Sequence, residues 1–134
     1  MIKIQKKDFI LDIEINKIKK KHNNIGAVST FVGYVRDTNN KQKVYSLDIE
    51  VYKDMAYRSF ENISLKAFKK WDLIDTIIIH RFGKIKVNKK IVLVATFAEH
   101  RKQSFAACNF LINYLKKDAP FWKKEYYKKK FNWL

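Results

Sequence analysis

Two long segments with helical periodicity alternate with runs of apolar, β-branched residues, and this alternation limits the folds open to the chain. In the first segment, about 54–71, apolar residues recur every three or four positions, which is the spacing of one face of an amphipathic helix. The second segment, about 102–116, repeats the pattern, and Pro120 prevents a helix from continuing beyond Asp118. Such helices bury their apolar face against a sheet or another helix. We therefore expect an α+β protein with two long helices.

The apolar runs between these helices predict the strands of a sheet. Residues 25–35, 76–80 and 90–97 are rich in β-branched and aromatic residues and lack helical periodicity. The last two runs contain too many consecutive apolar residues for surface strands. Residues 44–52 instead alternate apolar and polar side chains, as a strand with one solvent-exposed face does. We expect this segment to be the antiparallel partner of the strand before it.

The two ends of the chain are less regular. Residues 2–4 suggest a short strand, residues 11–21 fit a short helix about as well as a strand, and the residues after Pro120 form a tail. Asp54 can cap the first long helix with its side chain. No linker, repeat or low-complexity block divides the sequence. We expect a single domain over 1–134, with a mixed or mostly antiparallel sheet, two long helices and a short N-terminal helix.

Composition argues against several classes of protein. The longest apolar stretch, residues 91–98 apart from Thr96, is far shorter than the roughly 20 residues that span a bilayer. The first residues mix apolar and charged side chains, unlike a secretory signal, so we expect cytoplasmic residence. The single cysteine, Cys108, falls on the apolar face of a predicted helix, where a thiol is usually inert core filling. With three scattered histidines it gives no metal-ligand spacing, and we expect neither metal nor cofactor.

The formal net charge of +16 has two explanations. It can attract anions, whether nucleic acid, acidic membrane or a phosphorylated small molecule. It can also be compositional drift, because the sequence is rich in Lys, Asn and Ile, as an AT-rich genome would make it. Arg36 and Arg101 are placed to bind anions, since one leaves a predicted strand and the other opens a predicted helix.

Four segments of the sequence form a recognisable set when they are taken together. They are Phe31–Asp37, Ile79–Gly83, Ala98–Arg101 and Tyr114–Glu125. In their order and spacing they resemble the molybdopterin synthase large-subunit family, and the likeness runs over about residues 26–133. Two positions depart from the family pattern, since Val51 stands where a His is usual and Asp54 where a Gly is usual.

This resemblance implies an enzyme that installs two sulfurs in cyclic pyranopterin monophosphate to form the dithiolene of molybdopterin. The sulfur donor would be the C-terminal thiocarboxylate of a small ubiquitin-like subunit whose tail ends in Gly-Gly. The implied assembly is a homodimer of large subunits within a heterotetramer. Every reacting group is anionic, including the oxyanion that forms when the acyl–sulfur bond is attacked, so cations can stabilise each of them.

The resemblance also implies the site residues. Lys116 and Lys123 would be the catalytic pair, and a lysine packed among aromatic side chains could act as acid and base. Arg36 and Arg101 would hold phosphate or pterin oxygens. The substrate-binding positions as a whole would be Tyr34, Val35, Arg36, His100, Arg101, Lys116, Lys123, Lys124 and Glu125.

The length of the second helix adds a constraint. Fifteen helical steps from Arg101 to Lys116 cover about 22 Å at roughly 1.5 Å per residue. One small pterin cannot contact both ends of such a helix. Either the helix breaks early, or each site takes His100 and Arg101 from one subunit and Lys116 with Lys123 from another, which we favour.

Two alternatives remain open. Residues 121–133 interleave aromatics with lysines, as a surface for single-stranded nucleic acid or for a membrane does. Binding to oligonucleotides with a steep salt dependence would identify a nucleic-acid protein. The other alternative is a scaffold that keeps the dock for the small subunit but has lost turnover.

Overall fold

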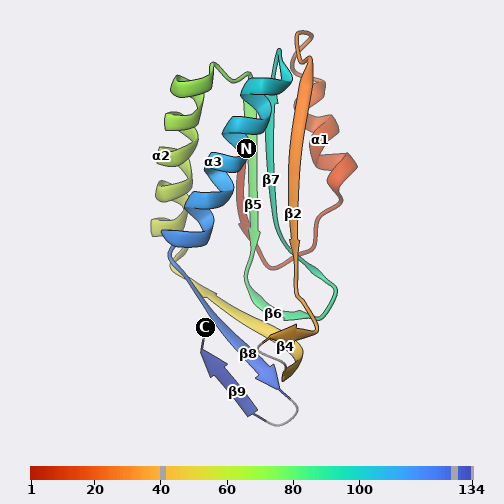
Figure 1. The fold of residues 1–134 in the computed structure, drawn as a ribbon, viewed down its shortest axis with the longest axis vertical. Helices are drawn as coiled ribbons and strands as arrows, with labels where there is room; N and C mark the ends of the chain where they lie inside the picture. Colours follow the sequence, from red (N-terminus) through yellow and green to blue (C-terminus); the bar gives the residue numbers. More distant parts are fainter. Residues whose placement is uncertain (40–41, 128–129, 134) are drawn as a thin grey trace.

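The computed structural model describes residues 1–39, 42–127 and 130–133, and at residues 39, 42 and from 123 onward it describes the backbone only. Helices and strands alternate along this part of the chain (Figure 1). In chain order they are β1 (Ile2–Gln5), α1 (Leu11–Lys19), β2 (Ala27–Tyr34), β3 (Thr38–Asn39), β4 (Gln42–Val51), α2 (Lys53–Trp71), β5 (Asp75–Arg81), β6 (Gly83–Lys86), β7 (Lys90–Ala98), α3 (Arg101–Lys117), β8 (Phe121–Tyr127) and β9 (Lys130–Trp133).

Strands β1, β5, β7 and β2 form, in that order, a mixed sheet. Strand β1 runs parallel to β5, and the other neighbours are antiparallel. Helices α2 and α3 cover one face of this sheet and α1 covers the other (Figure 1). Ile77, Ile78 and Ile79 of β5 are all 0% exposed, because both faces are covered, and this explains the unbroken apolar run. The predicted α+β fold, with a mixed sheet, two long helices and a short N-terminal helix, is confirmed.

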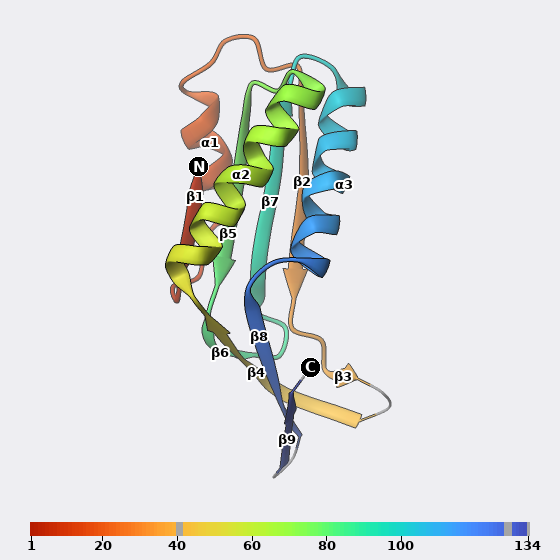
Figure 2. The ribbon, with the colours of Figure 1, turned by 90° about the vertical axis from the view of Figure 1, so that its left-hand side faces the viewer.

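A second sheet lies beyond one end of the first, at the bottom of both Figure 1 and Figure 2. Its strand order is β3-β4-β8-β9, and β6 also pairs with β4. Leu47, Ile49 and Ile85 contribute to its apolar core. Phe121, the first residue of β8, packs against this core and also against the core beneath α2 and α3. The ring of Phe121 therefore joins the two sheets.

Two predictions about strands are wrong. Strand β2 pairs with β7, and β4 pairs with β3, β6 and β8, so residues 44–52 are not the partner of the strand predicted at 25–35. Alternation of apolar and polar residues predicts a strand but does not say which strand lies beside it. The expected C-terminal tail is also wrong in its described part, because β8 pairs with β4 and β9 pairs with β8.

The expected cap of the first long helix is wrong as well. Helix α2 begins at Lys53, and Tyr52 occupies the N-cap position with extended backbone and no capping hydrogen bond from its side chain. Asp54 is thus inside the first turn, where its negative charge still favours the helix dipole. Helix α3 ends at Lys117, as the proline at position 120 requires.

No helix in the described part of the chain is long and apolar enough to cross a membrane.

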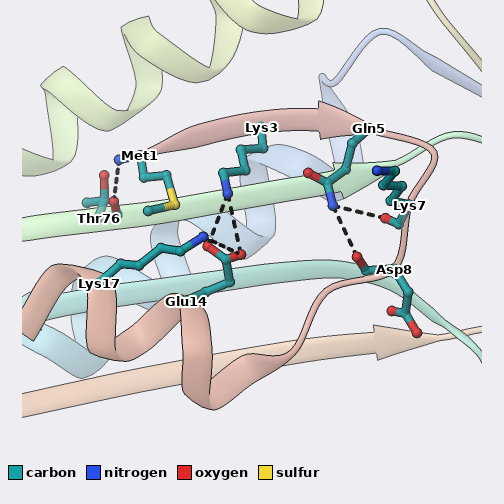
Figure 3. A network of polar contacts seen from close by, with 8 residues as sticks. All are labelled: Met1, Lys3, Gln5, Lys7, Asp8, Glu14, Lys17 and Thr76. Carbon is teal, nitrogen blue, oxygen red and sulfur yellow. Dashed lines mark hydrogen bonds and ion pairs between the residues drawn. The ribbon is translucent and has the colours of Figure 1, made fainter.

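A nearly buried carboxylate ties α1 to the first sheet. Glu14 of α1 has a side chain only 8% exposed, and it accepts hydrogen bonds from Lys3 of β1 at 3.3 Å and from Lys17 at 3.3 Å (Figure 3). The two lysine side chains are 34% and 47% exposed. A carboxylate this well buried needs its cations close by. The ion pair between Glu14 and Lys3 of β1 therefore fixes how α1 lies on the sheet.

We expect Glu14→Gln to destabilise the protein by about 1–2 kcal/mol, because charge-assisted hydrogen bonds are lost while solvent screens the freed lysines. Chemical denaturation measures this as a lower midpoint at an unchanged slope. Asp12→Asn is the matched control, since Asp12 is an exposed acid in the same helix. Equal midpoints for the two variants would contradict the proposed anchoring role of Glu14.

Candidate functional site

Helix α3 separates the described candidate residues into two groups. It starts just after β7 and runs back along the sheet as one continuous helix (Figures 1 and 2). His100 and Arg101 therefore lie at one end of the helix and Lys116 lies at the other. The helix does not break early, so that alternative is excluded, and the two groups form separate candidate half-sites within one chain.

The first half-site lies where α3 ends. Because Tyr34 pairs with Lys90 at the start of β7, the end of β2 reaches the same end of the sheet as the last turn of α3. Tyr34 is 54% exposed, and Arg36 and Lys116 are also exposed. No salt bridge joins either cation to an acidic group among the described residues. The side chains of Arg36 and Lys116 thus face solvent at this end and are available to bind an anion.

Val35 differs from its two neighbours in the predicted site. Its side chain is 1% exposed and packs in the core of the second sheet. Its backbone N–H donates to the carbonyl of Lys89 at 3.0 Å, and its carbonyl accepts from the N–H of Asn88 at 2.8 Å. Val35 therefore fixes the backbone between two exposed side chains, and its own side chain faces away from solvent.

The backbone of β8 brings the remaining predicted residues into the second sheet, next to β4. Lys123 is paired with Ile49, and the next two residues continue the ladder. The side chains of Lys123, Lys124 and Glu125 lie outside the described residues. Helix α3 leads into β8 through residues 118–120, so Lys123 follows Lys116 by a short connection at the same end of the molecule (Figure 2).

Exposed aromatic side chains flank this half-site. The rings of Tyr52 and Trp122 meet edge to face with centroids 4.9 Å apart, and the two side chains are 63% and 45% exposed. With Glu50 and Val51 they line a hollow of about 390 Å³. Lys116 itself is exposed in a single chain.

The second half-site lies where α3 begins. His100 occupies the N-cap position with φ −128° and ψ 147°, and its side chain makes no capping hydrogen bond. Only the N–H of Ser104 is bonded back to the carbonyl of His100, at 3.3 Å. The first helical N–H groups and the guanidinium of Arg101 therefore both favour an anion at this end.

A polar cavity of about 290 Å³ adjoins this helix start, and sequence reasoning did not find it. The side-chain oxygen of Gln103 is buried there without a hydrogen-bond partner among the described residues. Asp72, which contributes to the wall, has φ 51° at the end of α2. The cavity combines segments far apart in the sequence, so no local motif could reveal it. Its other polar lining residues are His22, Asn24, Glu99 and His100.

The only cysteine of the chain is unsuited to be a nucleophile. Cys108 is 5% exposed in the core between α3 and the sheet. Burial raises the pKa of its thiol to about 11, although a hydrogen bond with Thr96 opposes this shift. Because the thiolate is the reactive form, the expected role of Cys108 as core filling is confirmed. The chemistry open to the half-sites is binding and stabilisation of anions by lysine, arginine and helix N–H groups.

Known proteins share both the sequence and the fold. The molybdopterin synthase catalytic subunit of Ralstonia nicotianae is 45% identical over 124 residues, covering 92% of this chain and 70% of that protein. The MoaE protein from Burkholderia ambifaria matches the fold with a TM-score of 0.87 at 40% identity, over 100% of this chain and 88% of its own. Molybdopterin synthase from Staphylococcus aureus matches with a TM-score of 0.89 at 28% identity, over 98% and 95%. The family model described as MoaE protein covers residues 4–118, and the chain belongs to the MoaE protein family.

Proposed function

We propose that this chain is the catalytic subunit of a molybdopterin synthase. It transfers sulfur from the C-terminal thiocarboxylate of a small ubiquitin-like subunit to cyclic pyranopterin monophosphate and so forms the dithiolene of molybdopterin. Membership of the family and the 45% identity to a catalytic subunit support this reaction. The structural observation that carries the proposal is the pair of exposed cations, Arg36 and Lys116, at the end of the molecule where β8 begins.

The half-site at the end of α3 is the proposed place of sulfur transfer. The thiocarboxylate sulfur attacks a pterin carbon and displaces an oxygen substituent, which forms a thioester between the small subunit and the pterin. Water then attacks the acyl carbon, the acyl–sulfur bond breaks, the small subunit leaves as a carboxylate and the sulfur stays on the pterin. Negative charge develops on the acyl oxygen during this attack, and the ammonium groups of Lys116 and Lys123 stabilise it. Tyr34 and Arg36 hold the anionic substrate, and the guanidinium gives two parallel donors for phosphate. Lys124 and Glu125 follow on the same strand and complete the proposed binding residues. The sulfur arrives already activated, so the protein needs no nucleophilic thiol.

The half-site at the start of α3 belongs, in our proposal, to the reaction centre of a second copy. In the described part of the chain, β2 is the outer strand of its sheet and only β7 lies beside it. Val28 and Phe31 on this strand are 37% and 38% exposed, and Phe105 of α3 is 67% exposed. Two copies that meet antiparallel along β2 and α3 would bury these apolar groups. That arrangement would place His100 and Arg101 of one copy beside Arg36 and Lys116 of the other.

A direct assay tests the reaction. The protein is incubated with thiocarboxylated small subunit and cyclic pyranopterin monophosphate, and dithiolene formation is measured together with loss of the thiocarboxylate. We expect both, with two sulfurs consumed per pterin. A folded protein that binds the small subunit but forms no dithiolene would instead indicate a scaffold. We place the reaction in the cytoplasm, because thiol groups are kept reduced there.

Mixing variants tests whether sites are shared between copies. His100→Ala and Lys116→Ala chains, each inactive alone, are co-expressed with different tags. Half of the dimers are then mixed, and one of their two sites is intact, so we expect about a quarter of wild-type activity. Arg36→Ala mixed with Lys116→Ala is the control, because both changes affect the same half-site and every site keeps one lesion. Equal activity in the two mixtures would contradict shared sites.

A further inference from the structure

His80 is a buried ionisable side chain without a role in the proposed sulfur transfer. It lies near the end of β5 and is 5% exposed. Its Nδ1 atom is 2.8 Å from the carbonyl oxygen of Arg81. Because a carbonyl only accepts, Nδ1 carries a proton and donates it in this bond. The hydrogen bond therefore holds the imidazole ring in one orientation at the end of the first sheet.

The face of this ring supports Phe121. The two ring centroids are 3.7 Å apart and the ring planes differ by 17°. Phe60 of α2 lies beside the pair, with its centroid 5.8 Å from that of Phe121 and 6.4 Å from that of His80. Stacked aromatic rings at such distances attract one another beyond the area they bury. Phe121 is thus packed between β5 and α2, both of which belong to the first sheet and its helices.

Phe121 is also the point at which β8 starts. The backbone hydrogen bonds around the preceding turn are local, from the N–H of Asp118 to Tyr114 and from the N–H of Phe121 to Ala119, each at 2.9 Å. They shape the turn but do not attach β8 to the first sheet. The ladder with β4 fixes β8 within the second sheet, where Phe121 is paired with Val51. The stack on His80 attaches the start of β8 to β5.

We propose that His80 is a positioning residue for β8 and, through the ring of Phe121, for Lys123 two residues further on. The imidazole acts as a fixed platform, because its edge is bound to a carbonyl and its face carries the phenyl ring. The catalytic consequence rests on the proposed sulfur transfer, whereas the positioning of β8 does not. Small displacements of a catalytic group are costly to rate, since about 1 Å of misplacement can reduce it 10²-fold.

Hydrogen exchange tests the positioning itself. Three variants are compared: His80→Leu, which removes the ring and the donor; His80→Phe, which keeps a flat ring; and Phe110→Leu. The last is a matched control, because Phe110 meets Trp71, the last residue of α2, edge to face at 5.1 Å in the same core, and no ring contact joins it to Phe121 among the described residues. We expect amide exchange at residues 121–123 to be at least about 10-fold faster in His80→Leu only, because a local opening becomes easier. Unchanged exchange there would overturn the inference, whatever the activity.

Kinetics test the catalytic consequence. In His80→Leu we expect kcat to fall about 10-fold or more, with little change in the KM for the pterin or in the Kd for the small subunit. His80→Phe should recover kcat to within about 3-fold of wild type, because the platform remains. The double variant His80→Leu with Phe121→Leu should be no slower than the slower single variant, since both changes break one contact. A merely structural role would lower stability and leave kcat per folded molecule unchanged.

The outcomes separate the two proposals. If the wild-type protein forms no dithiolene, the proposed function fails, and hydrogen exchange still decides whether His80 positions β8. If the wild-type protein is active and His80→Leu keeps its kcat, the link from His80 to catalysis is refuted while the proposed function stands. Faster exchange of β8 together with a lower kcat that His80→Phe restores supports the whole inference.

Discussion

Replacing Lys116 with methionine is expected to slow single-turnover sulfur transfer by about 10²- to 10⁴-fold, the range over which acid–base groups contribute. Methionine keeps an unbranched apolar stem of similar length but has no ammonium to stabilise developing charge or to move a proton. Lys116 is exposed in the last turn of α3, so the substitution should leave stability almost unchanged. The measurement is rapid mixing of pterin with the preformed complex of large subunit and thiocarboxylated small subunit.

Lys117→Met is the control for this experiment. The two lysines are neighbours in the same turn, both are exposed, and both interact favourably with the helix dipole. They differ in direction, because successive residues of a helix are rotated by about 100°. If loss of positive charge in general matters, both variants should be slowed alike. If the ammonium group of residue 116 is catalytic, only Lys116→Met should be slowed. Equal rates for Lys116→Met and wild type would rule out the proposed role.

Gly26→Ala is expected to lower the free energy of unfolding by about 3 kcal/mol, the upper part of the range for overpacking. A Cβ atom at this position would lie 2.0 Å from the carbonyl oxygen of Glu99, and the next nearest atoms are also backbone. The backbone here is fixed by the hydrogen bond from the N–H of Gly26 to the carbonyl of Ala98 at 3.0 Å. Neither segment can therefore move aside without breaking the pairing of β2 with β7.

The backbone of Glu99 leads directly into His100 and Arg101, so the change at Gly26 acts next to the start of α3. Gly33→Ala is the comparison, since its new Cβ would meet the side chain of Val92 at 2.9 Å and not a backbone atom. A side chain can adjust more easily, so we expect a loss of about 1 kcal/mol. Urea denaturation at equal slope measures both. A larger loss in Gly33→Ala than in Gly26→Ala would show that the contact with Glu99 is loose.

The elements that could be predicted are those with a strong local pattern. The two long helices were expected at about 54–71 and 102–116, and they occupy 53–71 and 101–117. Their apolar faces pack on one side of the sheet, so the 3.6-residue period reports their environment directly. The start of α2 was missed because its N-cap, Tyr52, makes no side-chain bond, and a cap of this kind has no sequence signal.

The pairing of strands could not be predicted in the same way. Strand β4 forms its ladder with β8, which lies some seventy residues later in the chain. Residues 121–133 resemble an exposed tail in composition because lysines interrupt every apolar run. Their strand state depends on a partner that is distant in sequence, and such long-range context routinely overrides local preference.

The candidate site was predicted only in part, and mainly through family resemblance. Local sequence could place Arg36 after a strand and Arg101 at a helix start, and the structure has both there. It could not show that the side chain of Val35 packs in the core of the second sheet, because β2 ends at Tyr34 and the surroundings of the chain change at the next residue. Nor could it reveal the cavity beside Gln103, which three separate segments build.

The uninterrupted helix α3 has a consequence for how this protein can change over evolutionary time. The number of residues in α3 sets both the distance between its two ends and the rotation of one end relative to the other about the helix axis. Deleting one residue from its middle would shorten it by about 1.5 Å and turn one end by about 100° relative to the other. Substitutions at exposed positions of α3 other than Arg101, Phe105 and Lys116 should therefore be tolerated, whereas insertions and deletions within the helix should be selected against.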